Sequence, residues 1–151
     1  MTKFEPQDRN YESRVRESFA RQLVMHTLGA NLTLVEPGVV EIELPYRADL
    51  TQQHGFIHAG VVASILDSAC GYAAYSLMPA GAAVLSIEFK VNLLAPAKGD
   101  VVRAHAEVKR AGRNVTVCVA DAFAITDGQS KVVATMLATM MSILGRDDLV
   151  G

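Results

Sequence analysis

Residues 52–77 of this chain of 151 residues have the sequence QQHGFIHAGVVASILDSACGYAAYSL. From Ala59 to Leu77 this stretch has no proline, and its large apolar residues, such as Val62 and Leu66, cover one broad side of a helical pattern. The sequence Pro79-Ala80-Gly81 follows and ends the pattern. The stretch therefore predicts a long, mostly apolar central helix over 59–77.

The segments before and after this helix predict one further helix and a set of strands. Tyr11 to Leu28 is an amphipathic pattern ended by Gly29, with Val15, Phe19, Leu23, Val24 and Leu28 as its apolar side, which predicts one N-terminal helix. Two antiparallel strands are predicted on either side of the Pro37-Gly38 turn. Further strands are predicted over residues 84–94, 101–110, 114–126 and 131–144, with turns at Gly112 and at Asp127-Gly128.

This order of elements predicts the fold class and the domain organisation. One helix, two strands, a long apolar helix and then a run of strands indicate an α+β domain in which an antiparallel sheet packs on one helix. A chain of 151 residues is long enough for one core and too short for two ordinary ones. We expect residues 1–28 to be an N-terminal helical extension and residues 29–146 to be the main domain.

Composition excludes several classes of function. The 14 basic and 16 acidic residues nearly balance, which argues against a general nucleic-acid-binding protein. The apolar stretch Val61–Leu85 carries Asp67 and is interrupted by Pro79, so no membrane span is expected. Residues 1–10 are polar and lack the apolar core of a signal peptide, which predicts a cytoplasmic protein. Half of the residues are hydrophobic, and we expect part of that surface to be buried between subunits.

The two cysteines and the four histidines show no metal-binding pattern. Cys70 and Cys118 lie in apolar patterns without Cys-x-x-Cys spacing, so we expect buried free thiols. His54 and His105 have no partner at zinc-ligand spacing and are interpreted as surface or hydrogen-bonded residues. No metal and no redox cofactor is predicted.

Asp67 is the most informative residue, because a carboxylate in the middle of an apolar helix is disfavoured by helix propensity and by desolvation. Its helical neighbours three and four positions away are small, which leaves room for another backbone or a ligand to approach: they are Ala63, Ser64, Cys70 and Gly71. The carboxylate either has a structural role, satisfied by Ser64, Ser68 or a buried water, or serves a functional site.

The entry to the same helix is a second feature. Small residues at positions 59 and 60 expose the first backbone N–H groups of the helix. Those donors lie at the positive end of the helix dipole and suit an oxygen that gains negative charge during acyl transfer. Small residues also open many helices that have no catalytic role, so this feature alone leaves both interpretations open.

The run from Gln52 to Asp67 resembles a known family. His58-Ala59-Gly60 stands where the family pattern has His-Gly-Gly, and the acid follows eight positions after the middle residue. This is similar to the hotdog-fold acyl-CoA thioesterases, in particular the PaaI-like (phenylacetyl-CoA thioesterase-like) group of the 4-hydroxybenzoyl-CoA thioesterase superfamily. The resemblance extends from about Val40 to Leu144 and includes LSIEF at 85–89 and LAPAKG at 94–99. It implies a hotdog fold, in which an antiparallel sheet wraps around the central helix.

The resemblance also implies roles for five residues. Asp67 matches the catalytic acid, which acts as a nucleophile or as a general base on water. Ala59 matches a glycine whose backbone N–H polarises the thioester carbonyl, and Gln52 matches the Asn or Gln of the site. Ser86 matches the Ser or Thr that helps to orient the attacking water, and His58 matches the histidine of the motif, which we interpret first as helix-entry structure. Alanine in place of glycine at 59 brings a methyl group toward the thioester.

Spacing along the helix predicts a site shared between subunits. Ala59 and Asp67 are eight positions apart, which is about 12 Å along a helix, so one carbonyl cannot touch both. If both act on the same carbon, they come from different subunits whose central helices run antiparallel. The resemblance agrees, because hotdog proteins are dimers or dimers of dimers.

A local excess of positive charge between positions 90 and 113 suits the phosphates of coenzyme A, although a solvated strand face explains any single residue equally well. The resemblance implies a nucleotide near the loops around Lys98 and Arg110 to Asn114. The predicted substrate-binding and CoA-binding set is Gly60, Lys90, Lys98, Arg110, Arg113 and Asn114.

The resulting hypothesis is a thioesterase that hydrolyses an aryl- or short/medium-chain acyl-CoA, with coenzyme A present only as part of the substrate. Two alternatives remain open at this point. One is a non-catalytic acyl-CoA-binding protein on the same fold. The other is a hotdog dehydratase, for which His58 would be the candidate catalytic histidine, although the helix offers no second acid.

Overall fold

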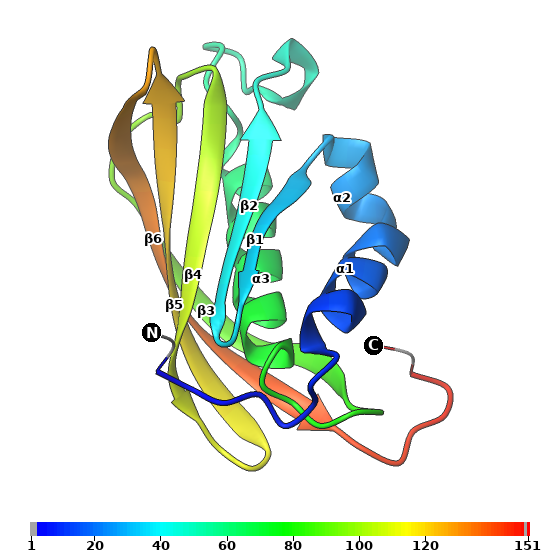
Figure 1. Ribbon diagram of the computed structural model, residues 1–151. Coiled ribbons are helices and arrows are strands. Elements are labelled where there is room, and N and C mark those ends of the chain that lie inside the picture. Colours follow the sequence, from blue (N-terminus) through cyan, green and yellow to red (C-terminus); the bar gives the residue numbers. More distant parts are fainter. Residues whose placement is uncertain (1–2, 150) are drawn as a thin grey trace.

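The computed structural model describes residues 3–149 and 151. A six-stranded antiparallel sheet, in the order β1-β2-β4-β5-β6-β3, curves along one side of the long helix α3 (Figure 1). The strands are β1 (Asn31–Glu36), β2 (Val39–Pro45), β3 (Ala83–Leu93), β4 (Val101–Ala111), β5 (Val115–Thr126) and β6 (Gln129–Ile143), with the short 3-10 helix η1 (Ala48–Leu50) after β2. The predicted α+β class and hotdog architecture are confirmed.

Helix α3 (Ala59–Tyr75) is the centre of the core and is two residues shorter than predicted. It packs against β2, β3, β4, β5 and β6. Val62, Ile65 and Leu66 are almost fully buried. No helix in the described part of the chain is long and apolar enough to cross a membrane.

Alanine dominates the part of the sheet face that β4 and β5 present to α3. The buried residues of β4 and β5 alternate along each strand, and most of them are small, so the helix can approach the strands closely: they include Ala104, Ala106, Ala120, Ala122 and Ala124. Short side chains therefore fill the layer between β4, β5 and the helix, whereas β2 and β6 contribute larger buried residues such as Ile42 and Met136.

The N-terminal helix is interrupted, and the prediction of one helix over residues 11–28 is wrong. The chain forms α1 (Tyr11–Arg21) and α2 (Leu23–Leu28), separated by Gln22 with φ −79° and ψ 97°. The break rotates the second segment, so Met25 and Leu28 become buried. Leu23, which was predicted for the apolar side, is instead 78% exposed.

Arg14 joins α1 to the carboxyl end of α3. Its guanidinium donates to the carbonyl oxygens of Pro79 at 2.8 Å, Met78 at 3.0 Å and Tyr75 at 3.2 Å. It also lies 4.6 Å from the centre of the Tyr75 ring and 3.3 Å from a carboxylate oxygen of Asp8. A cation at the carboxyl end of α3 complements the helix dipole and ties α1 to the turn that follows α3.

The hairpin between β5 and β6 turns at Asp127-Gly128, as predicted. Both residues have positive φ, 50° for Asp127 and 75° for Gly128, which is the conformation that two-residue hairpin turns of type I′ require. This turn fixes the register in which Thr126 pairs with Gln129.

Strand β3 lies at one edge of the sheet and contains a bulge. Ser86 pairs with Met140 and Glu88 pairs with Thr139, so Ile87 has no partner on β6. Because both Met140 and Ala138, the partner of Phe89, are buried, Ser86 and Phe89 lie on the same face of the sheet although they are three positions apart. The bulge thus changes which residues of β3 face inward.

Both cysteines are buried and free, as predicted. Cys118 Sγ donates to the backbone oxygen of Cys70 at 3.4 Å. Burial raises the pKa of Cys70 far above its usual range, and burial raises the pKa of Cys118 to about 12. Both thiols therefore remain protonated and unreactive near neutral pH.

Candidate active site

The carboxylate of Asp67 is held by a hydroxyl of the edge strand. Ser86 Oγ donates to Asp67 Oδ1 at 2.7 Å, and the same hydroxyl lies 3.3 Å from the sulfur of buried Met140. Asp67 itself is half-buried. Among the described residues, none donates a hydrogen bond to its second oxygen, Oδ2. The geometry therefore fixes one oxygen of the carboxylate and leaves the other available for chemistry.

The two serines that could have satisfied Asp67 locally have other partners. Ser64 Oγ donates to the backbone oxygen of Gly60 at 2.7 Å. Ser68 Oγ donates to Gln22 Oε1 at 3.3 Å. The local structural interpretation of Asp67, with Ser64 or Ser68 as its partner, is therefore wrong.

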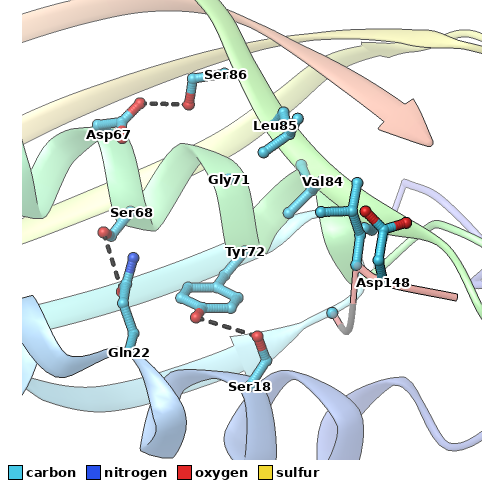
Figure 2. A pocket seen from close by; sticks show the side chains of 13 residues that line it. Ser18, Gln22, Asp67, Ser68, Gly71, Tyr72, Val84, Leu85, Ser86 and Asp148 are labelled. Carbon is cyan, nitrogen blue, oxygen red and sulfur yellow. Dashed lines mark hydrogen bonds between the residues drawn. The ribbon is translucent and has the colours of Figure 1, made fainter. Parts of the chain in front are cut away.

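Asp67 and Ser86 line a cavity of about 350 Å³ between α3, the start of β3, the N-terminal helices and the C-terminal tail (Figure 2). Gly71 and Tyr72 continue its wall along α3, and Val84 and Leu85 form the side that belongs to β3. Figure 2 shows the Asp67 and Ser86 side chains pointing toward each other at one end of this group of residues. The site is thus a half-buried carboxylate at the edge of a cavity.

His58 is the N-cap residue of α3. Its Nδ1 accepts the backbone N–H of Gly60 at 2.8 Å, which fixes the neutral tautomer with the proton on Nε2. A Cβ at Gly60 would lie 3.1 Å from that nitrogen, which explains the glycine at this position. Ala59 is the first helical residue and is exposed. Its backbone N–H is therefore one of the first N–H groups of the helix, which have no acceptor within the helix itself.

Gln52 and Ala59 share a second, more apolar cavity of about 520 Å³. Its walls come from the loop before α3 and from the end of β3, and include Phe56, Ile57, Leu93, Leu94 and Pro96. The side-chain oxygen of Gln52 accepts the backbone N–H of His54. One chain therefore places Asp67 with Ser86 in one cavity and Ala59 with Gln52 in another.

The predicted CoA-binding residues are all exposed and are distributed over separate parts of the chain. Lys90 is on β3, and Lys98 follows Ala97, which lines the second cavity. Arg110 is the second-last residue of β4, and Arg113 lies in the turn to β5. At about 3.3 Å per residue, β4 separates Lys98 from Arg110 by roughly 30 Å, so one subunit does not bring these two loops together. The remaining predicted residues are Gly60, whose N–H is used by His58, and Asn114, whose carbonyl accepts from Ser142.

Sequence reasoning missed two residues of the Asp67 cavity. Ser18 of α1 and Gln22 at the helix break both line it. In the sequence they are polar positions of an amphipathic helix, and polar residues are expected on the exposed side of such a helix. The helix break at Gln22 turns the side chain of this residue toward α3. The hydrophobic pattern of the sequence does not predict that break.

His105 lies on the outer face of the sheet between two carboxylates. Its Nδ1 is 2.9 Å from Glu41 Oε1 and its Nε2 is 3.2 Å from Glu107 Oε1. Partial burial lowers the pKa of His105, but the hydrogen bonds and charges of the two glutamates outweigh this and raise it above 6.5. No group of three or more metal-ligating side chains is found among residues 3–149 and 151. His105 is therefore a hydrogen-bonded structural residue, as predicted.

Three comparisons relate this geometry to known proteins. The family model described as Thioesterase superfamily matches residues 54–131. The solved structure of a thioesterase family protein from Silicibacter pomeroyi is 56% identical, with a TM-score of 0.88, and the match covers 89% of this chain and 99% of that one. The PaaI protein from the phenylacetic acid degradation operon of E. coli is 21% identical, with a TM-score of 0.79 over 91% of this chain and 96% of that one, a likeness of fold.

A curated relative from Halobacterium salinarum carries the name "Putative esterase" and is 35% identical over 95 residues. The match covers 60% of this chain and 62% of the relative, so the matched stretch spans less than two thirds of the relative's length. The fold that the motif at 52–67 predicted is confirmed by these likenesses, since the residues matched by the family model include His58-Ala59-Gly60, Asp67 and Ser86.

Proposed function

The chain belongs to the thioesterase superfamily, and on that premise we propose that it hydrolyses the thioester of an aryl- or short/medium-chain acyl-CoA to the free acid and coenzyme A. One observation carries the proposal. Asp67 offers a free carboxylate oxygen at a cavity, on a helix whose exposed first turn opens into a second cavity. A carboxylate and an oxyanion donor are the two groups that acyl transfer to water requires.

The proposed site is formed by two copies of the chain. Ala59 and Asp67 are eight residues apart on one helix, or about 12 Å along its axis, so the N–H of one copy serves the carboxylate of the other. The edge strand β3 supports this arrangement. Its apolar side chains are exposed in the single chain, with Leu85 at 50% and Ile87 at 55%. Within residues 3–149 and 151, no strand pairs with its outer edge. We propose a two-fold dimer joined near β3, alone or within a dimer of dimers.

In the proposed reaction, the thioester carbonyl oxygen accepts the Ala59 N–H of one subunit. The Asp67 carboxylate of the other subunit either takes a proton from a water molecule, whose oxygen attacks the carbonyl carbon, or attacks that carbon itself to form an anhydride that water then cleaves. The oxyanion collapses, the carbon–sulfur bond breaks and coenzyme A leaves as a thiolate. The thiolate takes up the proton released from water, which completes hydrolysis.

Ser86 and Gln52 are proposed as positioning residues. The Ser86 hydroxyl fixes one carboxylate oxygen of Asp67, so the other is aimed at water or at the thioester. Gln52 shares a cavity with Ala59, where its amide can meet the thioester or the attacking water. A thiol has a pKa of about 8.5, so its thiolate leaves without strong general-acid help, and no further catalytic acid is needed.

Basic side chains are proposed to meet the phosphates of coenzyme A. Lys98 lies next to the second cavity in the chain, which makes it the first candidate. Arg110, Arg113 and Asn114 lie at the opposite end of β4 and would serve a site only together with Lys98 of another subunit. Lys90 on the edge strand is the remaining candidate.

Thiol release from a panel of aryl, short and medium acyl-CoAs tests the proposal. Asp67→Asn removes the base but keeps the shape of the side chain, and we expect the rate to fall by about 10²–10⁴-fold. Asp121→Asn on the exposed outer face is the matched control and should keep the wild-type rate. Full activity in the Asp67→Asn variant would remove Asp67 from the mechanism. Tight retention of acyl-CoA by the wild type without thiol release would favour the non-catalytic binding protein.

A further inference from the structure

The segment that follows β6 forms part of the wall of the Asp67 cavity. We call residues 144–149 the strap. Figure 1 shows this part of the chain, in red, turning back from the end of β6 toward α1. Gly145 lies in the turn with φ 72°, a left-handed conformation that favours glycine. Asp148 and Leu149 then line the cavity, and Figure 2 shows Asp148 beside Val84 of β3.

Leu149 lies between two cavities. It lines the Asp67 cavity of about 350 Å³ and also a neighbouring cavity of about 380 Å³, to which Arg14, Tyr75 and Ala82 belong. Leu149 is half-buried, whereas residues 144–148 are exposed. The strap is therefore packed against the protein by the leucine side chain. Displacement of that side chain would join the two cavities and open them to solvent.

Few interactions hold the strap in place. Among the described residues, no hydrogen bond joins residues 144–149 to the rest of the protein. The bonds of the strap are local, since the Leu149 N–H donates to the Arg146 carbonyl and the Arg146 guanidinium donates to Asp148. Just beyond it, Arg21 of α1 donates to the backbone oxygen of Gly151. A segment with so few contacts opens at low free-energy cost, so we expect an open form at a population on the order of a few per cent.

We infer that the strap is a hinged cover of the Asp67 cavity, with Gly145 as the hinge and Leu149 as the latch. In the closed form, which the structure shows, the strap separates the cavity from solvent on the side between α1 and the start of β3. In the open form, a ligand enters or leaves the cavity from that side. Only the expectation that this ligand is an acyl group rests on the proposed function. Opening of such a segment can set the rate of ligand entry and product release.

A thiol placed under the strap reports its opening. Val84 lines the Asp67 cavity, and both native cysteines are fully buried, so the wild type provides the blank. In Val84→Cys, the rate of alkylation by N-ethylmaleimide, followed by mass spectrometry, should depend on the population of the open form. Leu149→Ala removes the latch and should raise this rate about tenfold. Leu144→Ala changes an exposed leucine outside both cavities and should leave the rate unchanged.

Gly145→Ala separates motion of the strap from a simple enlargement of the cavity, because it removes no side chain from the wall. A Cβ at position 145 would meet nothing within 4 Å, so the substitution acts through the backbone, which alanine disfavours at φ 72°. It should raise the alkylation rate of the Val84→Cys thiol about fivefold. Gly128→Ala is the matched control, because Gly128 has φ 75° and equally free space but lies in the hairpin between β5 and β6.

An exposed reporter and a folding test complete the experiment. The Ser130→Cys thiol should react at the same rate with and without each substitution, and thermal unfolding checks that every variant is folded. If neither Gly145→Ala nor Leu149→Ala accelerates alkylation of the Val84→Cys thiol, the inference is overturned. Acceleration by Leu149→Ala alone would identify a fixed wall and would also overturn the hinged cover.

Alkylation uses no substrate, so it distinguishes this inference from the proposed function. Faster alkylation in the hinge and latch variants of a protein that releases no thiol from any acyl-CoA would support the cover and contradict hydrolysis. Thiol release together with alkylation rates that neither substitution changes would support hydrolysis and contradict the cover.

Discussion

Ser86 Oγ donates to Asp67 Oδ1 at 2.7 Å although the two residues are 19 positions apart and lie on different elements. The strand bulge at Ile87 places Ser86 on the same face of the sheet as Phe89, three positions further along the strand. A hydrogen bond to a charged carboxylate is stronger than one between neutral groups, so it restrains the carboxylate against rotation. The first prediction rests on this restraint of the carboxylate.

Replacing Ser86 by alanine should lower kcat for thiol release about tenfold and leave KM nearly unchanged, because the carboxylate remains but is no longer held in one orientation. Steady-state kinetics on a substrate of the wild type measures both constants. Ser130→Ala, at an exposed serine on β6, is the matched control. A Ser86→Ala variant with the kcat of the wild type would show that the hydroxyl does not position the base.

Proline at position 59 isolates the role of one backbone N–H. Ala59 is the first helical residue, and His58 before it has φ −59° and ψ 139°, which a following proline accepts. The Ala59→Pro variant should therefore fold while it lacks the proposed oxyanion donor. We expect kcat to fall by about 10²–10³-fold, as measured by thiol release. Thermal unfolding checks that the fold is intact, and a folded variant with normal kcat would exclude this N–H from catalysis.

Mixing two inactive variants tests whether the site is shared between subunits. A dimer of one Asp67→Asn chain and one Ala59→Pro chain has one site in which both mutations meet and one site in which neither occurs. Unfolding the two variants together and refolding them should restore about a quarter of the wild-type activity per chain. Refolding each variant alone controls for the procedure. If the mixture remains inactive although mass spectrometry detects the mixed dimer, the site lies within one chain.

Arg14 should make a large contribution to stability for a residue outside the main core. It donates to three carbonyls at the end of α3, and its side chain is 16% exposed. Arg14→Ala should lower the free energy of unfolding by about 2–3 kcal/mol, measured in urea. Arg16, whose ion pair with Glu12 lies on the surface, is the matched control, and its alanine variant should change the free energy by less than about 0.5 kcal/mol. Equal effects of the two variants would contradict the role assigned to Arg14.

His105 predicts a dependence of stability on pH. Its pKa is raised from 6.5, so its contribution is fully present below pH 6.5 and is lost as the pH rises through the higher folded-state value. Hydrogen bonding to His105 lowers the pKa of Glu107 from 4.5, so the contribution of Glu107 is lost only as the pH falls through that lower value. The pair therefore stabilises most between about pH 4.5 and 6.5.

The urea midpoints of the wild type and of His105→Gln should accordingly differ more at pH 5.5 than at pH 8.5. His54→Gln, at an exposed histidine, serves as the control and should follow the wild type at both pH values. A difference between the wild type and His105→Gln that is constant with pH would show that the imidazole contributes through packing and not through its charge.

Much of the fold was predictable because local patterns agreed with long-range packing. The absence of proline over 59–77 and the Asp127-Gly128 pair are local signals, and the structure follows both. Leu23 shows where such signals fail. Its spacing from Phe19 suits a continuous helix, but the break at Gln22 turns it to the surface, because tertiary burial of Met25 and Leu28 prevails over the local period.

The residues of the candidate site could be predicted from the sequence, but the residues that contact them could not. Asp67 and the start of α3 are unusual for a helix and can be recognised without a structure. The partner of Asp67 could be assigned only by resemblance, since Ser86 is brought to it by the register of β3 and β6. Gln22 and Ser18 have no unusual sequence context, and only the packing of α1 and α2 places them at the cavity.

The alanine-rich inner face of the sheet has a consequence for how such a protein can diversify. Short side chains already bring α3 close to the strands. Enlarging the space between the helix and the sheet would therefore require the removal of methyl groups that pack the two layers together. New ligands are more readily accommodated at the periphery, where residues of the N-terminal helices and of the C-terminal tail can be substituted without disturbing that contact. Evolutionary change in selectivity should therefore concentrate in these peripheral segments, while the layered interior stays constant.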